Sequence, residues 1–202
     1  MVGMNRWDDK YAPARYFYGT EPNVLVREAL AGLPTGRALF LAEGEGRNAV
    51  HAASLGHEVV AVDSSAEGRR KALALAAERG VTLTYLLGDV GSTAWDDAPY
   101  DLAVLCFFHE WPAERARLHA RTAAALRPGG RLVVVSFAKE QLGRGTGGPP
   151  DLELLQDLDE VRGEFPGVIW ERAERLEVVQ HEGPGHDGPA TVNLLVGTAG
   201  QQ

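Results

Sequence analysis

Residues 37–63 read RALFLAEGEGRNAVHAASLGHEVVAVD. An apolar run leads into a Gly-x-Gly turn at Gly44 and Gly46. An alanine-rich segment with helical composition follows, and then a second apolar run that ends in Asp63. This order predicts a βαβ unit, in which a strand, a helix and a second, parallel strand follow one another. The stretch therefore indicates an α/β fold, and the rest of the chain is interpreted around it.

The turn and the acid also suggest a ligand site. Glycine has no Cβ, so Gly44 and Gly46 let the backbone turn sharply and approach a ligand at the start of the next helix. A carboxylate at the end of the second strand, about 20 residues further on, is placed to accept both hydroxyls of a ribose. The pattern Gly44-x-Gly46-x-x-Ala49 fits a dinucleotide and S-adenosylmethionine equally well. A tight turn without a ligand is the alternative.

Composition narrows the class of protein. The 202 residues suit one domain, and 45% hydrophobic with 24% charged residues is ordinary for a globular protein. The net charge of −8 and the absence of a basic run argue against a nucleic-acid partner. Cys106 is the only cysteine, and neither a signal peptide nor a membrane-spanning window is seen, so a cytoplasmic protein is expected. The histidines and the cysteine show no metal-ligand spacing.

The N-terminal residues 1–20 are rich in tyrosine and tryptophan. Such side chains suit an arm that folds over a site with its polar tips in water, and equally an arm that packs on the flank of the domain. Pro22 is expected in the first turn of a helix, with Glu21 or Thr20 as its cap.

After Asp63, the pattern continues to alternate. A helix is predicted over residues 66–79 with Ser64 or Ser65 as its cap, a strand over 82–87, a strand over 100–107 and a helix over 112–126. Asp89 follows the third strand and is expected to bind an adenine amino group or to cap its own turn. His109, beside Glu110, follows the fourth strand and is a candidate proton acceptor, with helix capping or packing as the alternative.

The last third of the chain reads differently. A buried strand follows the turn at residues 126–130, and the glycine-rich residues 142–150 are expected to be a loop that borders substrate or merely connects. An acidic helix is predicted over 151–164. Residues 168–180 and 190–198 read as two long antiparallel strands. We therefore predict a single domain over 1–202, divided into an arm at 1–20, a cofactor-binding core at 37–137 and a substrate-bordering part at 138–202.

With these segments placed, the chain resembles a class I S-adenosylmethionine-dependent methyltransferase along nearly its whole length. The resemblance is carried by Glu43-Gly-Glu-Gly46, Asp63, Gly88-Asp89-Val90 and Leu126-Arg-Pro-Gly-Gly130. The N-terminal Trp7-Asp-Asp-x-Tyr11 and Tyr18-Gly-Thr-Glu-Pro-Asn23, with Gly46-Arg-Asn48 and His181-Glu-Gly-x-x-His186-x-Gly188, look like the tellurite-resistance and thiopurine methyltransferase group.

The resemblance implies a Rossmann-like, seven-stranded, mostly parallel sheet with helices on both faces and a C-terminal antiparallel hairpin. It implies S-adenosyl-L-methionine as the cofactor and a small-molecule methyl acceptor, such as a thiol or a chalcogen oxyanion. Gly44 and Gly46 would contact the methionine part, Asp63 the ribose, and Asp89 with Val90 the adenine, while Phe107 and His109 would form a shelf. The predicted cofactor-binding set also includes Glu43, Asn48 and Ser64, and the predicted catalytic residues are His109 and Tyr18.

Two positions depart from the family pattern. Phe40 stands where the family usually has an acid, and Ala42 stands where it usually has the first glycine. The first change removes a carboxylate that helps to hold the cofactor's amino group, for which Glu43 or Glu45 is expected to compensate. Without such compensation, affinity for the cofactor would be weak and the protein would be a degenerate relative. A further alternative, which the same two positions motivate, is a non-catalytic methyltransferase fold that binds S-adenosylmethionine or its demethylated product as a sensor or scaffold.

The predicted chemistry needs little beyond alignment of a nucleophile and exclusion of water, because the sulfonium already activates the methyl group. Tyr11, Tyr16 or Tyr18 is expected to face the sulfonium. A thiolate or a selenium or tellurium anion needs no base, whereas an amine or hydroxyl acceptor would use His109. The rival enzyme is a nicotinamide-dependent oxidoreductase, against which the chain lacks a Tyr-x-x-x-Lys pair and a second domain. The sequence leaves the oligomeric state open.

Overall fold

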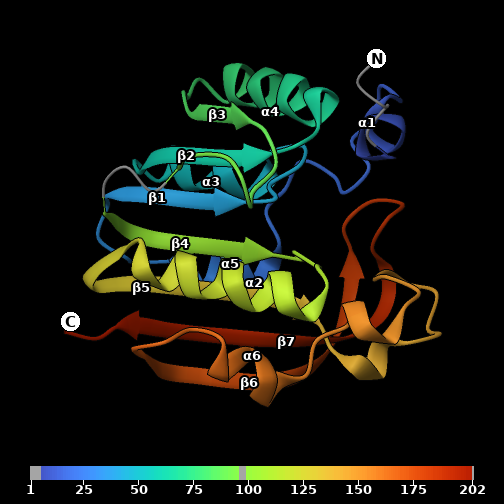
Figure 1. The fold of residues 1–202 in the computed structure, drawn as a ribbon. Coiled ribbons are helices and arrows are strands. Elements are labelled where there is room, and N and C mark those ends of the chain that lie inside the picture. The colour runs from blue at the N-terminus through green and yellow to red at the C-terminus, as the bar shows by residue number, and fades with distance from the viewer. Residues whose placement is uncertain (1–5, 96–98, 202) are drawn as a thin grey trace.

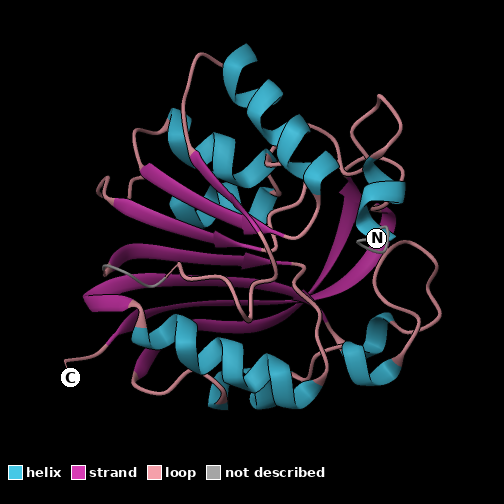
Figure 2. Cartoon of the chain, turned by 45° about the horizontal axis from the view of Figure 1, so that its top comes forward, coloured by secondary structure: helices cyan, strands magenta, loops and turns pink. Residues whose placement is uncertain are grey.

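A seven-stranded sheet with helices on both faces forms the body of the protein (Figures 1 and 2). The computed structural model describes residues 6–95 and 99–201, so residues 1–5 of the predicted arm and residue 202 of the predicted domain lie outside the described residues. The strands are β1 (Arg37–Leu41), β2 (Glu58–Asp63), β3 (Thr84–Leu87), β4 (Tyr100–Cys106), β5 (Leu126–Phe137), β6 (Val168–His181) and β7 (Asp187–Ala199). The helices are α1 (Arg6–Tyr11), α2 (Val24–Leu30), α3 (Arg47–Ser54), α4 (Ala66–Glu78), α5 (Pro112–Ala124) and α6 (Leu158–Gly163), with 3₁₀ turns at Lys139–Gln141 and Leu152–Leu154.

The strand order is β3-β2-β1-β4-β5-β7-β6. Strand β1 pairs in parallel with both β2 and β4, and Leu41 lies opposite Val62 on one side and Leu105 on the other. The chain therefore leaves β1 in one direction toward β3 and returns on the other side at β4. At such a reversal the loops after β1 and β4 separate, which opens a crevice at the carboxyl ends of the strands.

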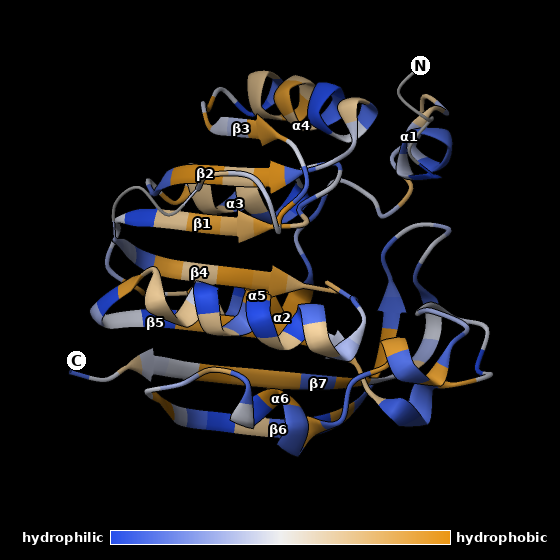
Figure 3. Ribbon diagram, in the orientation of Figure 1, coloured by the Kyte–Doolittle hydropathy of each residue, from blue (hydrophilic) through white to orange (hydrophobic). Residues whose placement is uncertain are grey.

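Alternate residues of the strands build two cores. Ala38 and Phe40 pack on one face of the sheet with residues of α2, α3 and α4, while Leu39 and Leu41 pack on the other face with residues of α5 and α6. Figure 3 shows the central strands as nearly continuous apolar runs. Both faces of the parallel part are covered, as parallel sheets require.

The predicted fold class is confirmed, including the antiparallel C-terminal pair. Strand β7 runs antiparallel to both β5 and β6, with Val134 opposite Leu195 and His181 opposite Asp187. None of the helices in the described ranges 6–95 and 99–201 is both long and apolar enough to cross a membrane.

The predicted start of α2 was wrong. Pro22 precedes the helix, and the cap is Asn23 rather than Glu21 or Thr20. The Asn23 side-chain oxygen accepts hydrogen bonds from the backbone N–H groups of Leu25 and Val26, at 3.1 and 3.3 Å. Asparagine is among the strongest capping residues because its short side chain reaches these free donors.

The single helix predicted over 151–164 is also wrong. A 3₁₀ turn is followed by a break, and α6 begins only after Asp157, whose side chain caps it. The break arises because Gln156 is held in extended backbone: its N–H donates to the Phe137 carbonyl at 3.0 Å. Gln156 also forms a parallel β-bridge with Ala138, so the segment extends the end of β5 instead of continuing a helix.

The N-terminal arm is fixed to the domain by a buried ion pair. Glu45, 4% exposed, lies 2.8 Å from the ammonium of Lys71, 2% exposed. The same carboxylate accepts the backbone N–H groups of Phe17 and Tyr18, at 2.7 and 3.3 Å, and Lys71 also donates to the carbonyl of Arg15 at 2.7 Å. The turn after β1 and helix α4 thus hold the arm jointly.

Replacing Lys71 with methionine should lower the free energy of unfolding by about 3–5 kcal/mol, since it leaves the Glu45 carboxylate buried without its cation. Denaturant unfolding measures the loss. The double variant Glu45→Gln with Lys71→Met should recover part of it, because no unpaired charge then remains buried. A double variant that loses the sum of the two single effects would show that the pair is not coupled.

Candidate functional site

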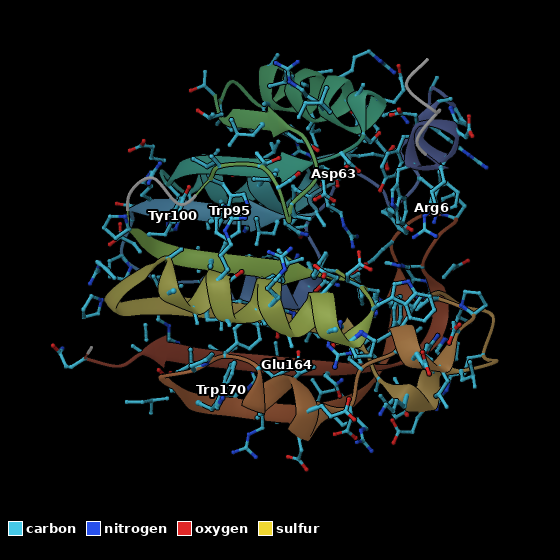
Figure 4. All side chains as sticks on the ribbon, in the orientation of Figure 1. Arg6, Asp63, Trp95, Tyr100, Glu164 and Trp170 are labelled. Atoms are coloured by element: carbon cyan, nitrogen blue, oxygen red, sulfur yellow. The ribbon has the colours of Figure 1, made fainter. Side chains whose placement is uncertain are left out.

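A cavity of about 180 Å³ lies at the carboxyl ends of β1, β2 and β4. Figure 4 shows Asp63 and Arg6 on the side where β1 and β2 end, whereas Tyr100 lies toward the side where the strands begin. Of the eleven residues predicted for cofactor binding and catalysis, nine line this cavity: Tyr18, Glu43, Asn48, Asp63, Ser64, Asp89, Val90, Phe107 and His109. The fold therefore brings these side chains together from segments that are distant in the sequence.

Asp63 is almost buried, at 8% exposed, at the end of β2. One carboxylate oxygen accepts the N–H of Gly44 at 2.9 Å, and the other accepts the N–H of Ser65 at 2.8 Å. Burial raises the pKa of Asp63, and these backbone donors partly offset the rise. The backbone of Ser64 also donates to this carboxylate, and the group keeps acceptor capacity for a ligand hydroxyl beyond these three N–H donors.

Glu43 occupies the N-terminus of α3. Its Oε1 accepts the backbone N–H groups of Asn48 and Ala49, at 2.9 and 2.7 Å. Burial raises the pKa of Glu43 to about 7 in spite of these bonds. The carboxylate therefore changes charge near neutral pH, while its side chain faces the cavity.

Gly44 and Gly46 do not line the cavity, although the sequence predicted them as direct contacts. A Cβ on Gly46 would lie 2.4 Å from the Cβ of Ala72, so this glycine lets the turn approach α4. Gly44 has φ +59°, donates to Asp63 and accepts the hydroxyl of Tyr85 at 2.5 Å. Both glycines shape the cradle, and their contact with a cofactor stays a prediction.

The predicted adenine contacts lie at the rim. Asp89 is exposed, and its Oδ1 accepts the N–H groups of Gly91 and Ser92, at 2.9 and 3.1 Å. The turn-capping role weighed from the sequence is therefore present, and the other carboxylate oxygen is not used in that turn.

Asn48 is buried and accepts the N–H of Asn23 at 2.9 Å, which ties α3 to the start of α2.

His109 is held by backbone on both sides of its ring. Nδ1 lies 2.7 Å from the carbonyl of Leu154, so it donates, and Nε2 accepts the N–H of Phe137 at 3.4 Å. Burial lowers the pKa of His109 to about 4. With both nitrogens engaged, the geometry favours a structural role, and the catalytic role of His109 stays a prediction.

Tyr18 reaches the cavity, whereas Tyr16 does not. The Tyr16 hydroxyl donates to the carbonyl of Lys71 at 3.0 Å, on α4. Tyr11 lines the cavity and is 5% exposed. The Tyr18 hydroxyl accepts the ammonium of Lys10 at 2.6 Å, and burial raises the pKa of Tyr18 to about 12. The arm thus both covers the cavity and packs on the domain.

The sequence did not identify several cavity residues. Arg6, Trp7, Arg47 and His186 contribute to its lining, together with Cys106, Phe108 and Glu110. Glu45, which was predicted only as a replacement for the missing acid, also lines it. Arg47 and His186 belong to motifs that the sequence displays, but nothing in the sequence shows that the last hairpin returns to the turn after β1. Among the described residues, no group of three or more His, Cys, Asp or Glu side chains is placed to hold a metal ion.

Two further cavities adjoin the first. One, of about 510 Å³, lies between the arm, the loop after β5 and the β6–β7 hairpin, and the other, of about 370 Å³, lies between α2 and that hairpin. Tyr18 and Phe107 line all three cavities, and His186 lines the first and the 510 Å³ cavity. Figure 1 shows α1 and the β6–β7 connection on the same side of the sheet as the ends of β1, β2 and β4.

Comparison with known protein families indicates which kind of domain the cofactor-binding part of the chain resembles. Residues 38–130 match the model of a family described as "Methyltransferase domain". This part of the chain is therefore similar to a methyltransferase domain. That range includes β1 through the turn at the start of β5, and so the first cavity's Asp63, Asp89 and His109. No curated protein matches the chain.

Solved structures share the fold of this chain. A structure from work on the conversion of a disulfide bond into a thioacetal group during echinomycin biosynthesis has a TM-score of 0.74 at 20% identity, covering 96% of this chain and 90% of that one. TehB from Haemophilus influenzae has a TM-score of 0.70 at 14% identity, covering 95% and 65%. Magnesium protoporphyrin IX methyltransferase from Synechocystis PCC 6803, with bound SAH, has a TM-score of 0.65 at 18% identity, covering 86% and 80%.

The match of residues 38–130 to the methyltransferase model supports the predicted S-adenosylmethionine-dependent methyltransferase and its cofactor, and the solved structures share its fold. They argue against the nicotinamide-dependent alternative, and the antiparallel β7 between β5 and β6 is part of the shared architecture. The finer resemblance to the tellurite-resistance group is not decided, since TehB is one of several neighbours.

The residues present fit this cofactor. Asp63 keeps acceptor capacity for a ribose hydroxyl, and Val90, Phe107 and Phe108 offer apolar surface for a base. Carboxylates at Glu43 and Asp63 suit a ligand that carries ammonium and sulfonium charges. When bound, the cofactor supplies a methyl group activated by the sulfonium.

The two departures from the family pattern have structural explanations. Phe40 is fully buried in the core shared with α2, α3 and α4, so its side chain does not face the cavity. Ala42 has φ +54°, a conformation that glycine adopts without strain. Two residues were predicted to replace the missing acid. Both carboxylate oxygens of Glu45 are engaged, one by Lys71 and the other by the backbone of the arm. Glu43 has one carboxylate oxygen that forms no hydrogen bond with any described residue.

Replacing Ala42 with glycine should leave the free energy of unfolding unchanged or raise it by up to about 1 kcal/mol. The left-handed conformation costs an alanine about 1–2 kcal/mol, which exceeds the entropy that a glycine loses on folding. Denaturant unfolding checks this. The matched control is Ala74→Gly on the exposed face of α4, which should lose about 1 kcal/mol. An equal loss in both variants would contradict strain at Ala42.

The affinity for S-adenosylhomocysteine should rise several-fold from about pH 6 to about pH 8, with part of the rise due to Glu43. In the protein without ligand, Glu43 has a pKa of about 7 and is half protonated at pH 7. The ammonium of the ligand favours the charged carboxylate, so binding releases a proton. Calorimetry in two buffers of different ionisation enthalpy counts that proton. Glu43→Gln keeps an oxygen for the α3 amides and should remove this contribution. Identical pH profiles for the variant and the wild type would exclude Glu43.

Proposed function

We propose that this protein transfers a methyl group from S-adenosylmethionine to a small molecule whose acceptor is a thiol, a chalcogen oxyanion or a similar nucleophile. The proposal rests chiefly on one observation: a 510 Å³ cavity shares Tyr18, Phe107, His109 and His186 with the cofactor cavity. A molecule held there would present its nucleophile to the cofactor's methyl group across this shared wall. The volume lies in the range typical of small-molecule sites.

The chemistry of the cavity supports a neutral or anionic acceptor with an apolar or aromatic body. Five aromatic side chains line it, contributed by the arm and the sheet: Trp7, Phe17, Tyr18, Phe107 and Phe137. Its charged lining residues are Arg6 and Lys10, and none of the described residues that line it is Asp or Glu. A cationic amine would lack a counter-charge there, whereas a thiolate or an oxyanion would find one.

Two structural neighbours point to the same chemistry. One was solved in work on the conversion of a disulfide bond into a thioacetal group, a transformation at sulfur, and another is TehB. Together with the motifs shared with the tellurite-resistance and thiopurine methyltransferase group, they support sulfur or a heavier chalcogen as the acceptor atom.

We further propose a cytoplasmic enzyme without a nucleic-acid or membrane partner, consistent with the net charge of −8.

The test is an acceptor panel with S-adenosylmethionine in excess, in which formation of S-adenosylhomocysteine is measured for an aryl thiol, an alkyl thiol, selenite, tellurite and a primary amine. We expect turnover with at least one thiol or oxyanion and much less with the amine. Binding of S-adenosylhomocysteine without turnover on any of them would contradict this acceptor class.

A glycine in the loop tests the location of the acceptor. A Cβ on Gly147 would lie 2.8 Å from Phe137 and 2.9 Å from His186, so Gly147→Ala should crowd the 510 Å³ cavity and raise KM for the acceptor about tenfold or more. Gly143→Ala is the control, because Gly143 lies in the same loop and also has a positive φ, +78° against +144° for Gly147, but has nothing within 4 Å of its Cβ. Equal KM values in the two variants would place the acceptor elsewhere.

A further inference from the structure

His186 lies where the cofactor and acceptor cavities meet. It is 4% exposed and lines both of them. Its ring centroid is 4.4 Å from that of Tyr18 and 4.4 Å from that of Phe107, and Phe137 lies edge-on at 5.1 Å. The ring is therefore confined by aromatic groups contributed by the arm and the sheet.

A carboxylate fixes which nitrogen of His186 carries the proton. Nδ1 lies 3.4 Å from Oε2 of Glu182, and a carboxylate can only accept, so the hydrogen of neutral His186 belongs on Nδ1. Nε2 then carries the lone pair, and it makes no hydrogen bond with any residue in the described ranges. This is the arrangement in which a histidine can take a proton from a ligand.

Glu182 is itself held in place. Its Oε2 lies 2.7 Å from the guanidinium of Arg47, and its Oε1 accepts the side-chain amide of Asn23 at 2.7 Å. Arg47 also donates to the carbonyl of Tyr18 at 3.0 Å. Burial raises the pKa of Glu182, but the hydrogen bond from His186 and the charge of Arg47 outweigh it and lower the pKa overall.

Burial and the nearby cations favour the neutral form of the His186 ring. The groups that act on His186 are Glu182 from its own hairpin, Arg47 from α3, Lys10 from α1 and His109 after β4. Burial lowers the pKa of His186, the hydrogen bond to Glu182 partly restores it, and Arg47 and Lys10 lower it further. A neutral imidazole is the form that can accept a proton.

His109, the sequence-derived candidate base, differs in this respect. Both of its nitrogens are bonded to backbone groups, at Leu154 and Phe137. A proton could reach Nε2 of His109 only if that backbone bond broke. His186 needs no such change.

We propose that His186 is the proton acceptor for acceptors that are protonated when they bind, with Glu182 as its positioning residue. The proposal rests on the function proposed above. For a thiol, Nε2 of His186 takes the S–H proton and the ring becomes an imidazolium facing Glu182. The electron pair left on the acceptor sulfur forms the bond to the methyl carbon, and the carbon–sulfonium bond breaks with its pair retained by the departing sulfur. The imidazolium then releases its proton to water.

The first test needs no turnover. Nitrogen-15 NMR of the free protein should show neutral His186 protonated at Nδ1, and a pH titration should give its pKa. Glu182→Gln removes the carboxylate charge and should lower that pKa by about one unit. A hydrogen on Nε2 in the neutral form would overturn the proposal.

The second test compares two acceptors in one variant. His186→Asn keeps an amide that can donate to Glu182 but cannot take a proton. It should lose about 10²-fold or more in kcat with an alkyl thiol, which is protonated at neutral pH, and little with an aryl thiol that is already ionised. His181→Asn is the control, since His181 lies on the same hairpin with its side chain 77% exposed. Melting temperature and S-adenosylhomocysteine affinity are measured for both variants, so that a defect in folding or cofactor binding is distinguished from a loss of proton transfer.

The outcomes separate the two proposals. Wild-type turnover that persists undiminished in His186→Asn with the alkyl thiol would overturn the role of His186 and leave the proposed function intact. Equal losses with both thiols would show that His186 shapes the site without taking the proton, which also overturns it. Absence of wild-type turnover with every acceptor would overturn both.

Discussion

The turn that follows β1 constrains most of the site, because each of its residues contacts a different part of the molecule. Glu43 accepts the first amides of α3, and Gly44 donates to Asp63 at the end of β2. Glu45 holds Lys71 of α4 and the backbone of the arm. Gly46 has no Cβ and so allows Ala72 of α4 to approach. Two helices, a strand and the arm are thereby positioned by four residues, from Glu43 to Gly46.

This arrangement places charged groups where water is largely excluded. Glu43, Glu45 and Asp63 all lie beside the cofactor cavity, yet each has a different set of partners. Glu45 is neutralised by a cation and has a structural role, while Asp63 is satisfied by backbone donors that leave lone pairs available. Glu43 receives two amides on one oxygen, and burial raises its pKa to about 7. Three carboxylates close together can thus serve three purposes, because burial and partners rather than residue type set their charge.

The two histidines at the cavity illustrate the same principle. His109 follows β4 directly, where a sheet of this kind delivers functional side chains, and the sequence therefore pointed to it. The backbone at Leu154 and Phe137 occupies both of its nitrogens, which no local pattern reveals. His186 is remote in the sequence and reaches the cavity only because β7 pairs with β5 and β6, so that their hairpin returns to Arg47 and the arm. Long-range pairing, rather than proximity in the chain, selects the histidine with a free nitrogen.

The sequence by itself determined the α/β class, the order of the elements, the antiparallel end of the sheet and the acid after β2. These depend on local periodicity and on turn residues, which act over a few positions. It also indicated a methyltransferase, because the motifs at Gly44, Asp63 and Gly130 are short stretches next to predicted strands and can be recognised without the tertiary structure. Only the tertiary structure decided that Asn23 caps α2, that Gln156 interrupts the predicted helix and that Phe40 points into the core. It alone showed which of Glu43, Glu45, His109 and His186 keeps an unused atom beside the cavity, since hydrogen-bond partners, burial and cavity shape arise from contacts between residues far apart in the chain.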